Sequence, residues 1–482
     1  MTLVSNLLRP IQAFRIAYLP LVMVYFAYGA LGLIDVTRDL WIKEKSTLTA
    51  SELAGIGVWL TLPWTVKMVF GELVDCVPIF GSRRRIYILI GAAFTAAGLI
   101  ILAGAAGGWL TFARLGYLYL LGSLSIVLGT VIQDVVADAM TTEVVPRIDA
   151  AGKPMPEEHL RTELGLVQVI GRFSLSAGVL AVAGLSGYLA GALSRESVFL
   201  LGLAIPALSI TGVLLIKSEI GEPRPIDWRI LGGGIAFGTA VVALGLGGVP
   251  FAQEIIFVIS MAVICTMLVL ATSEISAENQ RKILYTTIII FAFRATPNVG
   301  DGYFWWTLDV LKFDAEFYGV LRQTGAVLSL IVLFLFAKQL AEYSAAKTLL
   351  ALTILSTLLA LPMVGLYYGL AEWTERMFGF GARSIALVDT AAVGPFAQLS
   401  MIPLLTLTAF YAPPGHRATW FALMASLMNM ATVAGQLQTK YINQAFLVER
   451  GAYGELGLLV LTVLILDFLI PISAILLFGR RT

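Results

Sequence analysis

Long apolar runs alternate with short polar segments along the chain. Each run has about 20 residues, which is the length that an α-helix needs to cross the hydrocarbon core of a bilayer. We find fourteen such runs, at residues 17–37, 53–74, 86–106, 115–140, 163–190, 197–216, 229–248, 251–272, 283–308, 316–337, 347–369, 384–411, 418–445 and 455–478. The pattern therefore predicts an all-α polytopic membrane protein with about fourteen spans.

The composition agrees with this fold class. The 482 residues are 58% hydrophobic and 13% charged, with a mean hydropathy of +0.87, whereas a soluble domain carries about 25% charged residues. The two cysteines form no disulfide framework and no metal-ligand pattern. We also find no phosphate-binding glycine loop and no nucleophile motif, so we expect neither an enzyme nor a cofactor or metal site. The net charge of +1 gives no reason to expect a nucleic-acid partner.

The distribution of Lys and Arg between the loops predicts the orientation, because basic residues concentrate on the cytoplasmic side. With the N-terminus inside, the inside segments hold 18 Lys and Arg residues and the outside segments hold 9. An even number of spans then places both termini in the cytoplasm. We expect the membrane to be a bacterial inner (plasma) membrane.

Three recurring residues indicate that the two halves of the chain are related. Trp41, Glu52 and Gly55 return 264 residues later as Trp305, Glu316 and Gly319. Both sets surround the turn between the first two spans of a half, and duplicated six-span units are a transporter architecture. We therefore expect an N-terminal six-helix bundle at 1–216, a linker with an inserted transmembrane hairpin at 217–282, and a C-terminal six-helix bundle at 283–482.

Two carboxylates lie inside the fourth span. Asp134 and Asp138 are about one helical turn apart, so they share one face of the helix. Charges at this depth are costly unless they are paired or face water, which makes them candidates for function. Two close carboxylates disfavour joint ionisation, so one of them could carry a transported proton. The alternative is a structural charge network with Glu143 and the loop arginines.

Three basic residues lie nearest the middle of the membrane: Lys67, Arg172 and Arg294. An anionic substrate would need cations at that depth, and guanidinium groups bind carboxylates with two hydrogen bonds. Arg294 is followed by Pro297 and Gly300, which predict a broken helix that exposes backbone groups to a ligand. The alternative for Lys67 and Arg172 is that they only neutralise the aspartates of the fourth span.

Two side-chain amides, Gln398 and Asn429, are further candidates for binding the substrate. Both lie in predicted spans of the second half. The alternative is that each amide forms a hydrogen bond between neighbouring helices.

The inner end of the second span carries a glycine, acid and arginine motif, Gly71-Glu-Leu-Val-Asp75 followed by Cys-Val-Pro-Ile-Phe-Gly-Ser-Arg-Arg-Arg. A glycine permits close helix approach at 71 and a tight turn at 81, and Asp75 is placed to pair with an arginine. We expect this loop to act in gating through Gly71, Asp75, Gly81, Arg83, Arg84 and Arg85. The alternative is that the arginines only anchor the loop on the inner side.

This motif resembles the inner-loop signature of the major facilitator superfamily, with extra residues before the basic triplet. The longer form is similar to the folate–biopterin transporter family. Four other segments are also similar to segments of that family: Leu62-Pro-Trp-Thr-Val-Lys67, Gln133-Asp-Val-Val-Ala-Asp138, Phe293-Arg-Ala-Thr-Pro297 and Phe313-Asp-Ala-Glu-Phe317. The resemblance implies a major-facilitator fold and a secondary transporter of folates, pterins or similar organic anions, driven by protons. The inserted hairpin departs from the twelve core spans of that family.

We therefore expect alternating-access transport of a small organic anion in symport with protons. The expected partners are this anion, protons and the lipid bilayer, with a membrane-protein partner on the hairpin at 229–272. Two alternatives stay open. A fourteen-span drug/proton antiporter would have an acidic rather than a basic cavity. A non-transporting membrane assembly or pigment- or carrier-delivery protein on the same fold would dock through the hairpin.

Overall fold

The computed structural model describes residues 14–82, 84–145, 153, 155–216, 226, 228–273, 276–342, 345–399 and 417–481. Within this part the chain forms helices and no β-strand. The first half contains α2 (Leu19–Ala30), α3 (Asp35–Lys45), α4 (Ala50–Thr65), α5 (Lys67–Cys76), α6 (Arg85–Gly107), α7 (Leu115–Glu143), α8 (Glu157–Ala192), α9 (Arg195–Leu201) and α10 (Ala204–Leu214). The predicted hairpin is α11 (Trp228–Leu246) and α12 (Ala252–Ala271).

The second half contains α13 (Ala277–Arg294), α14 (Asp301–Asp309), α15 (Ala315–Glu342), α16 (Ala345–Leu359), α17 (Leu361–Tyr367), α18 (Leu370–Phe378), α19 (Ala382–Leu399), α21 (Arg417–Ala445) and α22 (Leu456–Phe478). Each predicted span falls on one of these helices or on two successive ones. Ten segments in the described residues are long and apolar enough to cross a bilayer. The protein is therefore an all-α integral membrane protein, as predicted.

The four remaining predicted spans are also helical but are more polar or less complete. They lie on α13 with α14, on α15, on α19 and on α21. The first is interrupted after Arg294, and the predicted span at 384–411 extends past the end of α19 into residues that lie outside the described part. α21 carries Asn429, Lys440 and several glutamines within its length. In the first and the last of these spans the interruption and the polar residues lower the local hydropathy without removing the helix. In α15, the side chains of residues 336–342 lie outside the described part.

The contacts divide the chain into two compact units. Unit 1 contains Met1–Glu44 and Val69–Gly233, and unit 2 contains Lys45–Met68 and Gly234–Thr482. The predicted second span is thus shared, because α4 packs within unit 2 and α5 lies almost wholly in unit 1. The bundle boundaries at 216 and 283 stay a prediction based on the sequence.

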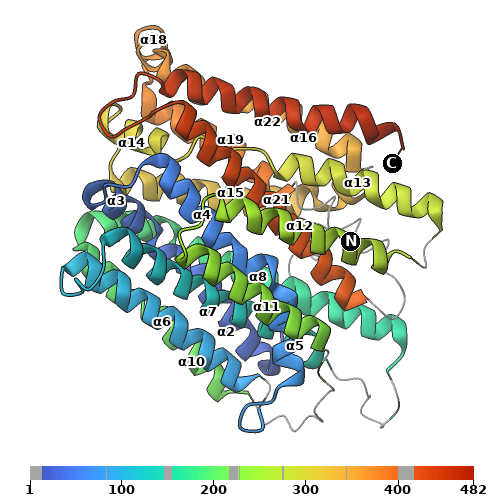
Figure 1. Cartoon of the computed structure of the whole chain (residues 1–482). Coiled ribbons are helices and arrows are strands. Elements are labelled where there is room, and N and C mark those ends of the chain that lie inside the picture. The colour runs from blue at the N-terminus through green and yellow to red at the C-terminus, as the bar shows by residue number, and fades with distance from the viewer. Residues whose placement is uncertain are drawn as a thin grey trace. The chain divides into compact units, whose positions relative to one another are not determined.

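In unit 1, glycines allow α6 and α7 to pack side by side (Figure 1). A Cβ atom on Gly98 would lie 2.4 Å from the carbonyl oxygen of Gly122, and one on Gly129 would lie 2.3 Å from that of Gly91. In a bilayer the hydrophobic effect does not drive helices together, because lipid tails are as apolar as the side chains. Small residues let the backbones approach closely, and van der Waals packing then supplies the attraction.

A Gly98→Ala variant is expected to destabilise the protein by about 1–3 kcal/mol, because the new methyl group meets backbone rather than a mobile side chain. Gly232→Ala is the matched control, since its Cβ would have no described atom within 4 Å and alanine favours the helix. Thermal unfolding in detergent should show a lower Tm for Gly98→Ala only. An equal Tm for both variants would mean that α6 and α7 can separate without cost.

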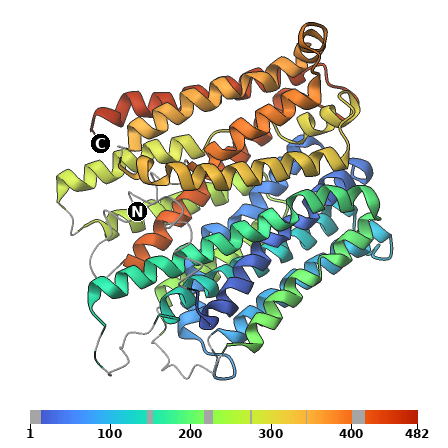
Figure 2. The same cartoon turned by 180° about the vertical axis from the view of Figure 1, so that it is seen from behind.

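The long helix α8, blue-green in Figure 2, packs against α2 in the same unit. Here a Cβ on Gly29 would lie 2.0 Å from the carbonyl oxygen of Leu175, and one on Gly178 would lie 2.2 Å from that of Phe26. This close contact brings the side chains of α2, α7 and α8 together further along the helices.

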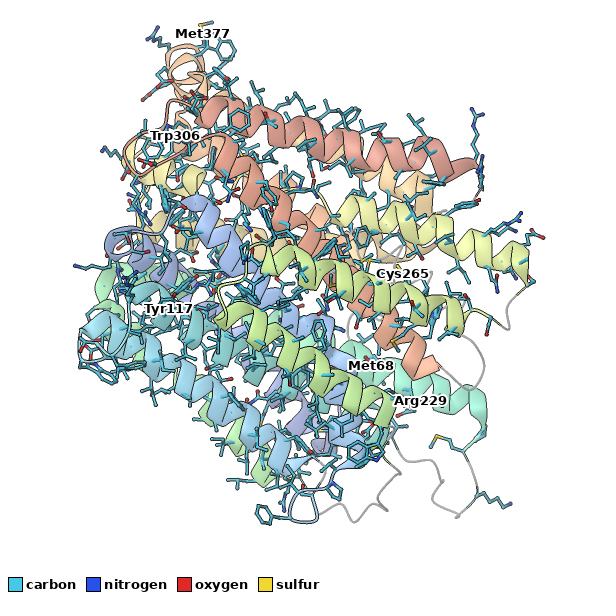
Figure 3. The ribbon with its side chains drawn as sticks, viewed as in Figure 1. Met68, Tyr117, Arg229, Cys265, Trp306 and Met377 are labelled. Carbon is cyan, nitrogen blue, oxygen red and sulfur yellow. The ribbon has the colours of Figure 1, made fainter. Side chains whose placement is uncertain are left out.

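Unit 2 has its main apolar core between α4, α12, α13, α16, α21 and α22. Val58 of α4, Ile256 of α12 and Trp420 of α21 are almost fully buried in it. A second cluster surrounds Trp306 of α14 and includes Ala371 of α18, and Figure 3 shows Trp306 and Met377 at the same end of the unit. From Gly234 onward, the hairpin packs on this unit through Phe237, Val241 and Leu244 of α11.

Candidate functional site

Three helices of unit 1 bring Tyr25, Asp134, Asp138 and Arg172 together. The hydroxyl of Tyr25 on α2 donates to Oδ1 of Asp138 on α7 at 2.6 Å. Arg172 on α8 interacts electrostatically with Asp138, Tyr25 and Asp134. Asp134 is buried and Asp138 is half-buried, whereas Arg172 is exposed. Both carboxylates thus lie within the electrostatic reach of one guanidinium, and the group of four residues carries a net negative charge when both acids are ionised.

The neighbouring side chains hold α7 in place. Gln168 donates to the hydroxyl of Thr141 at 2.7 Å, and that hydroxyl donates to the carbonyl oxygen of Asp138 at 2.6 Å. A Cβ atom on Gly171 would lie 2.7 Å from the ring of Tyr25, so the glycine creates the space that the tyrosine fills. The sequence predicted that the two aspartates share a face. Tyr25 and Gly171 were not foreseen, since neither residue type is unusual in a span.

The loop between α5 and α6 is organised by one buried arginine. Arg84 donates from Nη2 to Oδ1 of Asp75 at 2.8 Å and from Nε to Oε2 of Glu143 at 3.0 Å. Burial alone would lower the pKa of Arg84, but the hydrogen bonds and charges of Glu143 and Asp75 raise the pKa of the guanidinium above its ordinary value. The predicted pairing of Asp75 with an arginine is thus present, and it extends to the end of α7.

The other residues of the loop motif have different surroundings. Gly81 has φ +75°, which explains the need for glycine in this turn. The expected close helix approach at Gly71 is wrong for this structure, because no described atom lies within 4 Å of a Cβ placed there. The backbone N–H of Arg85 donates to the hydroxyl of Ser82 at 3.1 Å. Arg83 lies outside the described residues.

In unit 2, the predicted helix break after Arg294 is present. α13 ends at Arg294 and α14 begins at Asp301. Side chains of α21 bind the backbone of the break: Gln438 donates to the carbonyl oxygen of Ala295, and Thr439 accepts from the N–H of Asn298 at 2.9 Å. Irregular backbone at membrane depth needs such partners, because lipid offers none.

The remaining predicted substrate residues are separated along the chain. Lys67 begins α5 and Arg294 ends α13, and both are half-buried. Asn429 of α21 donates to the carbonyl oxygen of Trp64 in α4 at 2.9 Å, which is a hydrogen bond between helices. Gln398 belongs to α19, but its side chain lies outside the described part. Lys67, Arg294 and Asn429 are in unit 2, and Arg172 is in unit 1.

Two carboxylates of unit 2 were missed by the sequence reasoning. Asp389 on α19 interacts electrostatically with Tyr303, and Asp467 on α22 accepts a hydrogen bond from Thr296 at the helix break. Both lie within predicted spans, at 384–411 and 455–478. A systematic search for acids inside spans would have found them, since charge at this depth is itself the signal.

The segment Phe313–Phe317 begins α15. Oδ1 of Asp314 accepts from the backbone N–H of Phe317 at 2.8 Å, and Oδ2 pairs with Arg383 at 2.5 Å. The hydrogen bond from Phe317 and the charge of Arg383 lower the pKa of Asp314 below its ordinary value. Asp314 therefore has a structural role as a helix cap.

Comparison with known proteins adds four findings. A sequence profile of the BT1 family matches residues 29–481. The chain is 27% identical to the folate-biopterin transporter of Synechocystis sp. over 94% of its length and 80% of that protein. It is 23% identical to probable folate-biopterin transporter 4 of Arabidopsis thaliana, with 92% of each chain covered. It is 22% identical to folate transporter 2 of Plasmodium falciparum, over 94% of this chain and 86% of that one.

Solved structures show the same fold. A crystal structure of a POT family transporter in complex with 5-aminolevulinic acid is similar with a TM-score of 0.66 and 12% identity, over 96% of both chains. That of a D-xylose-proton symporter is similar with a TM-score of 0.56 and 13% identity, over 94% of this chain and 96% of that one. The predicted major-facilitator fold is confirmed, and the curated relatives are transporters rather than enzymes.

Proposed function

Because this chain belongs to the BT1 family, we propose that it is a secondary transporter that moves a small organic anion of the folate or pterin class. The observation that carries this proposal is the similarity to named folate-biopterin transporters along 94% of the chain. Transport proceeds by alternating access and is coupled to protons. The membrane is a bacterial inner membrane, with both termini in the cytoplasm.

The charged residues of unit 1 support proton coupling. Asp134 and Asp138 both interact electrostatically with the guanidinium of Arg172, so adding one proton to the two acids makes this group neutral. Arg172 interacts electrostatically with both acids and is also exposed. It can therefore exchange a carboxylate of the protein for a carboxylate of the substrate, and this exchange links the proton to the anion.

The cations of unit 2 support anion binding. Arg294 ends α13 at the break, where Gln438 and Thr439 of α21 bind the nearby backbone. Lys67, Asn429 and Gln398 complete the proposed substrate-binding set. Charge-assisted hydrogen bonds from a guanidinium are roughly twice as strong as neutral ones, so Arg172 and Arg294 provide most of the affinity for carboxylates.

A binding screen of the purified protein tests the proposed substrate class. Folic acid and biopterin should bind saturably, and each should raise the Tm of the full-length chain, because a ligand that binds only the folded state stabilises it. Arg294→Gln is expected to weaken folic acid binding by about tenfold, the loss of one charge-assisted pair. Arg376→Gln, on the exposed helix α18, is the control and should leave binding unchanged.

The result that would overturn the substrate assignment is equal binding of an unrelated anion of the same charge, such as a simple dicarboxylate, at the same affinity as folic acid. Binding of folate and biopterin without uptake into proteoliposomes would favour a non-transporting role on the same fold. Preferential binding of cationic drugs would favour the antiporter alternative.

A further inference from the structure

The inserted hairpin contacts both a first-half helix and a second-half helix of unit 2 through one amide. Gln253, in the first turn of α12, donates from Nε2 to the carbonyl oxygen of Gly55 in α4 at 2.8 Å. Its Oε1 accepts from Nζ of Lys440 in α21 at 3.1 Å. A Cβ atom on Gly55 would lie only 3.3 Å from Nε2 of Gln253, so glycine leaves the carbonyl open to this bond.

The next residue of the hairpin strengthens its attachment to α21. Glu254 pairs with Lys440 at 2.7 Å and accepts from the hydroxyl of Tyr441 at 2.7 Å. The side chains of Lys440 and Glu254 are 19% and 23% exposed. An ion pair with this little exposure is screened less than a surface pair, and the first turn of a helix favours the acid.

Further donors bind the backbone of the α4 segment. Arg450 donates to the carbonyl oxygen of Leu48 at 2.6 Å, and Asn429 donates to that of Trp64 at 2.9 Å. The segment from 48 to 64 is thus bound by second-half side chains near its start and its end, and by Gln253 near its middle. The hairpin supplies the middle contact.

α4 also has a point about which it can turn. Pro63 lies inside the helix and removes one backbone hydrogen bond, and α4 ends at Thr65 with Val66 as its C-cap, whose φ and ψ are −107° and 21°. Immediately afterwards the chain continues as α5, most of which belongs to unit 1. α4 is therefore joined at one end to a different unit and bound along its length by unit 2.

We propose that the α11–α12 hairpin is a latch that holds α4 against α21, and that breaking the contacts of Gln253 and Glu254 lets α4 turn about the Pro63–Val66 segment. This gives the hairpin a role within the chain. The inference goes beyond the proposed substrate, and it rests on alternating access only for its consequence in transport. Its test needs no substrate.

The test measures how fast a buried cysteine of α4 reacts with a maleimide in the purified full-length protein. Val58 is fully buried against α21 and is replaced by cysteine, with the native cysteines Cys76 and Cys265 changed to serine. The rate of labelling reports how often α4 leaves α21. In this background, Glu254→Gln and Lys440→Gln are each expected to raise the rate about fivefold, and Tyr441→Phe about threefold.

Two controls separate a latch from a general loss of stability. Ile289→Cys, which is fully buried in the same core on α13, should keep its labelling rate in every latch variant. The charge exchange Glu254→Lys with Lys440→Glu restores the pair and should return the rate of Val58→Cys toward that of the parent. The proposal is overturned if Val58→Cys labels at the parent rate in all three latch variants, or if Ile289→Cys accelerates equally.

Discussion

An Asp134→Asn variant is expected to lose uptake driven by a pH gradient while it keeps exchange of substrate between the two sides of the membrane. Asparagine has the shape of aspartate but cannot bind and release a proton. Asp134 is 5% exposed and interacts electrostatically with Arg172, as Asp138 does, so its buried negative charge needs compensation. Binding of a transported proton can neutralise the carboxylate of Asp134, in addition to the charge of Arg172.

The measurement compares two conditions in proteoliposomes: uptake of labelled folate under an inward proton gradient, and exchange of labelled for unlabelled folate without a gradient. Thr130→Val is the matched control, because Thr130 is a buried polar residue on α7 whose hydroxyl donates to the carbonyl oxygen of Ile126 in its own helix at 2.7 Å. It should leave both activities unchanged.

Three outcomes are informative for the coupling role. Retention of gradient-driven uptake by Asp134→Asn would exclude Asp134 as the coupling group and direct the same assay to Asp138 and Asp389. Loss of both activities would assign Asp134 to structure or to binding. Loss of gradient-driven uptake alone is the result that the proposed mechanism requires.

Replacing Arg84 by methionine is expected to lower the free energy of unfolding by about 2–3 kcal/mol and transport by more than tenfold. Arg84 is 4% exposed and binds both Asp75 and Glu143, which are 40% and 38% exposed. Removing one partner of a buried pair costs about 3–5 kcal/mol, and the exposure of both acids to solvent reduces this value. Transport is expected to fall further than stability, because Arg84 joins the ends of α5 and α7 through its ion pairs with Asp75 and Glu143.

Arg84→Lys keeps the charge but lacks the two-pronged geometry that contacts both acids, so we expect it to recover only part of the stability. A charge reversal at Asp75 separates gating from folding: it should slow transport while folate binding stays at the parent affinity. If binding is lost and the transport rate of bound substrate is unchanged, the loop has no gating role. Chemical unfolding and folate binding are measured on the same preparations.

Hydrophobic pattern alone predicted most of the fold, because burial in lipid requires about 20 apolar residues whatever the neighbours of a helix are. Thus the span at 251–272 was placed correctly without any knowledge of α21. The break after Arg294 was also predictable, since proline at 297 and glycine at 300 act on the local backbone. The charged residues at membrane depth were visible for the same reason, although Asp389 and Asp467 were overlooked.

The partners of those charged residues could not be predicted in the same way. Nothing near Asp138 in the sequence points to Tyr25, which is 113 residues away. Arg84 was one of three consecutive arginines, and only packing singled it out for Asp75 and Glu143. The attachment of the hairpin was even harder to predict from the sequence. Gln253 donates to the backbone carbonyl of Gly55, and every residue has such a carbonyl, so the sequence does not single it out.

By itself, then, the sequence determined that this chain crosses the membrane many times, where its helices lie, and which charges lie among apolar residues. Those properties follow from the free energy of transferring each residue from water to lipid, and this free energy depends on the residue and its near neighbours in the sequence. Only the tertiary structure decided that Asp134 and Asp138 interact with Arg172, that α4 packs with second-half helices, and that α12 is joined to α21 by Lys440 and Glu254. Such contacts join distant segments and depend on which faces of the helices meet, and a pattern read along one helix does not contain that information.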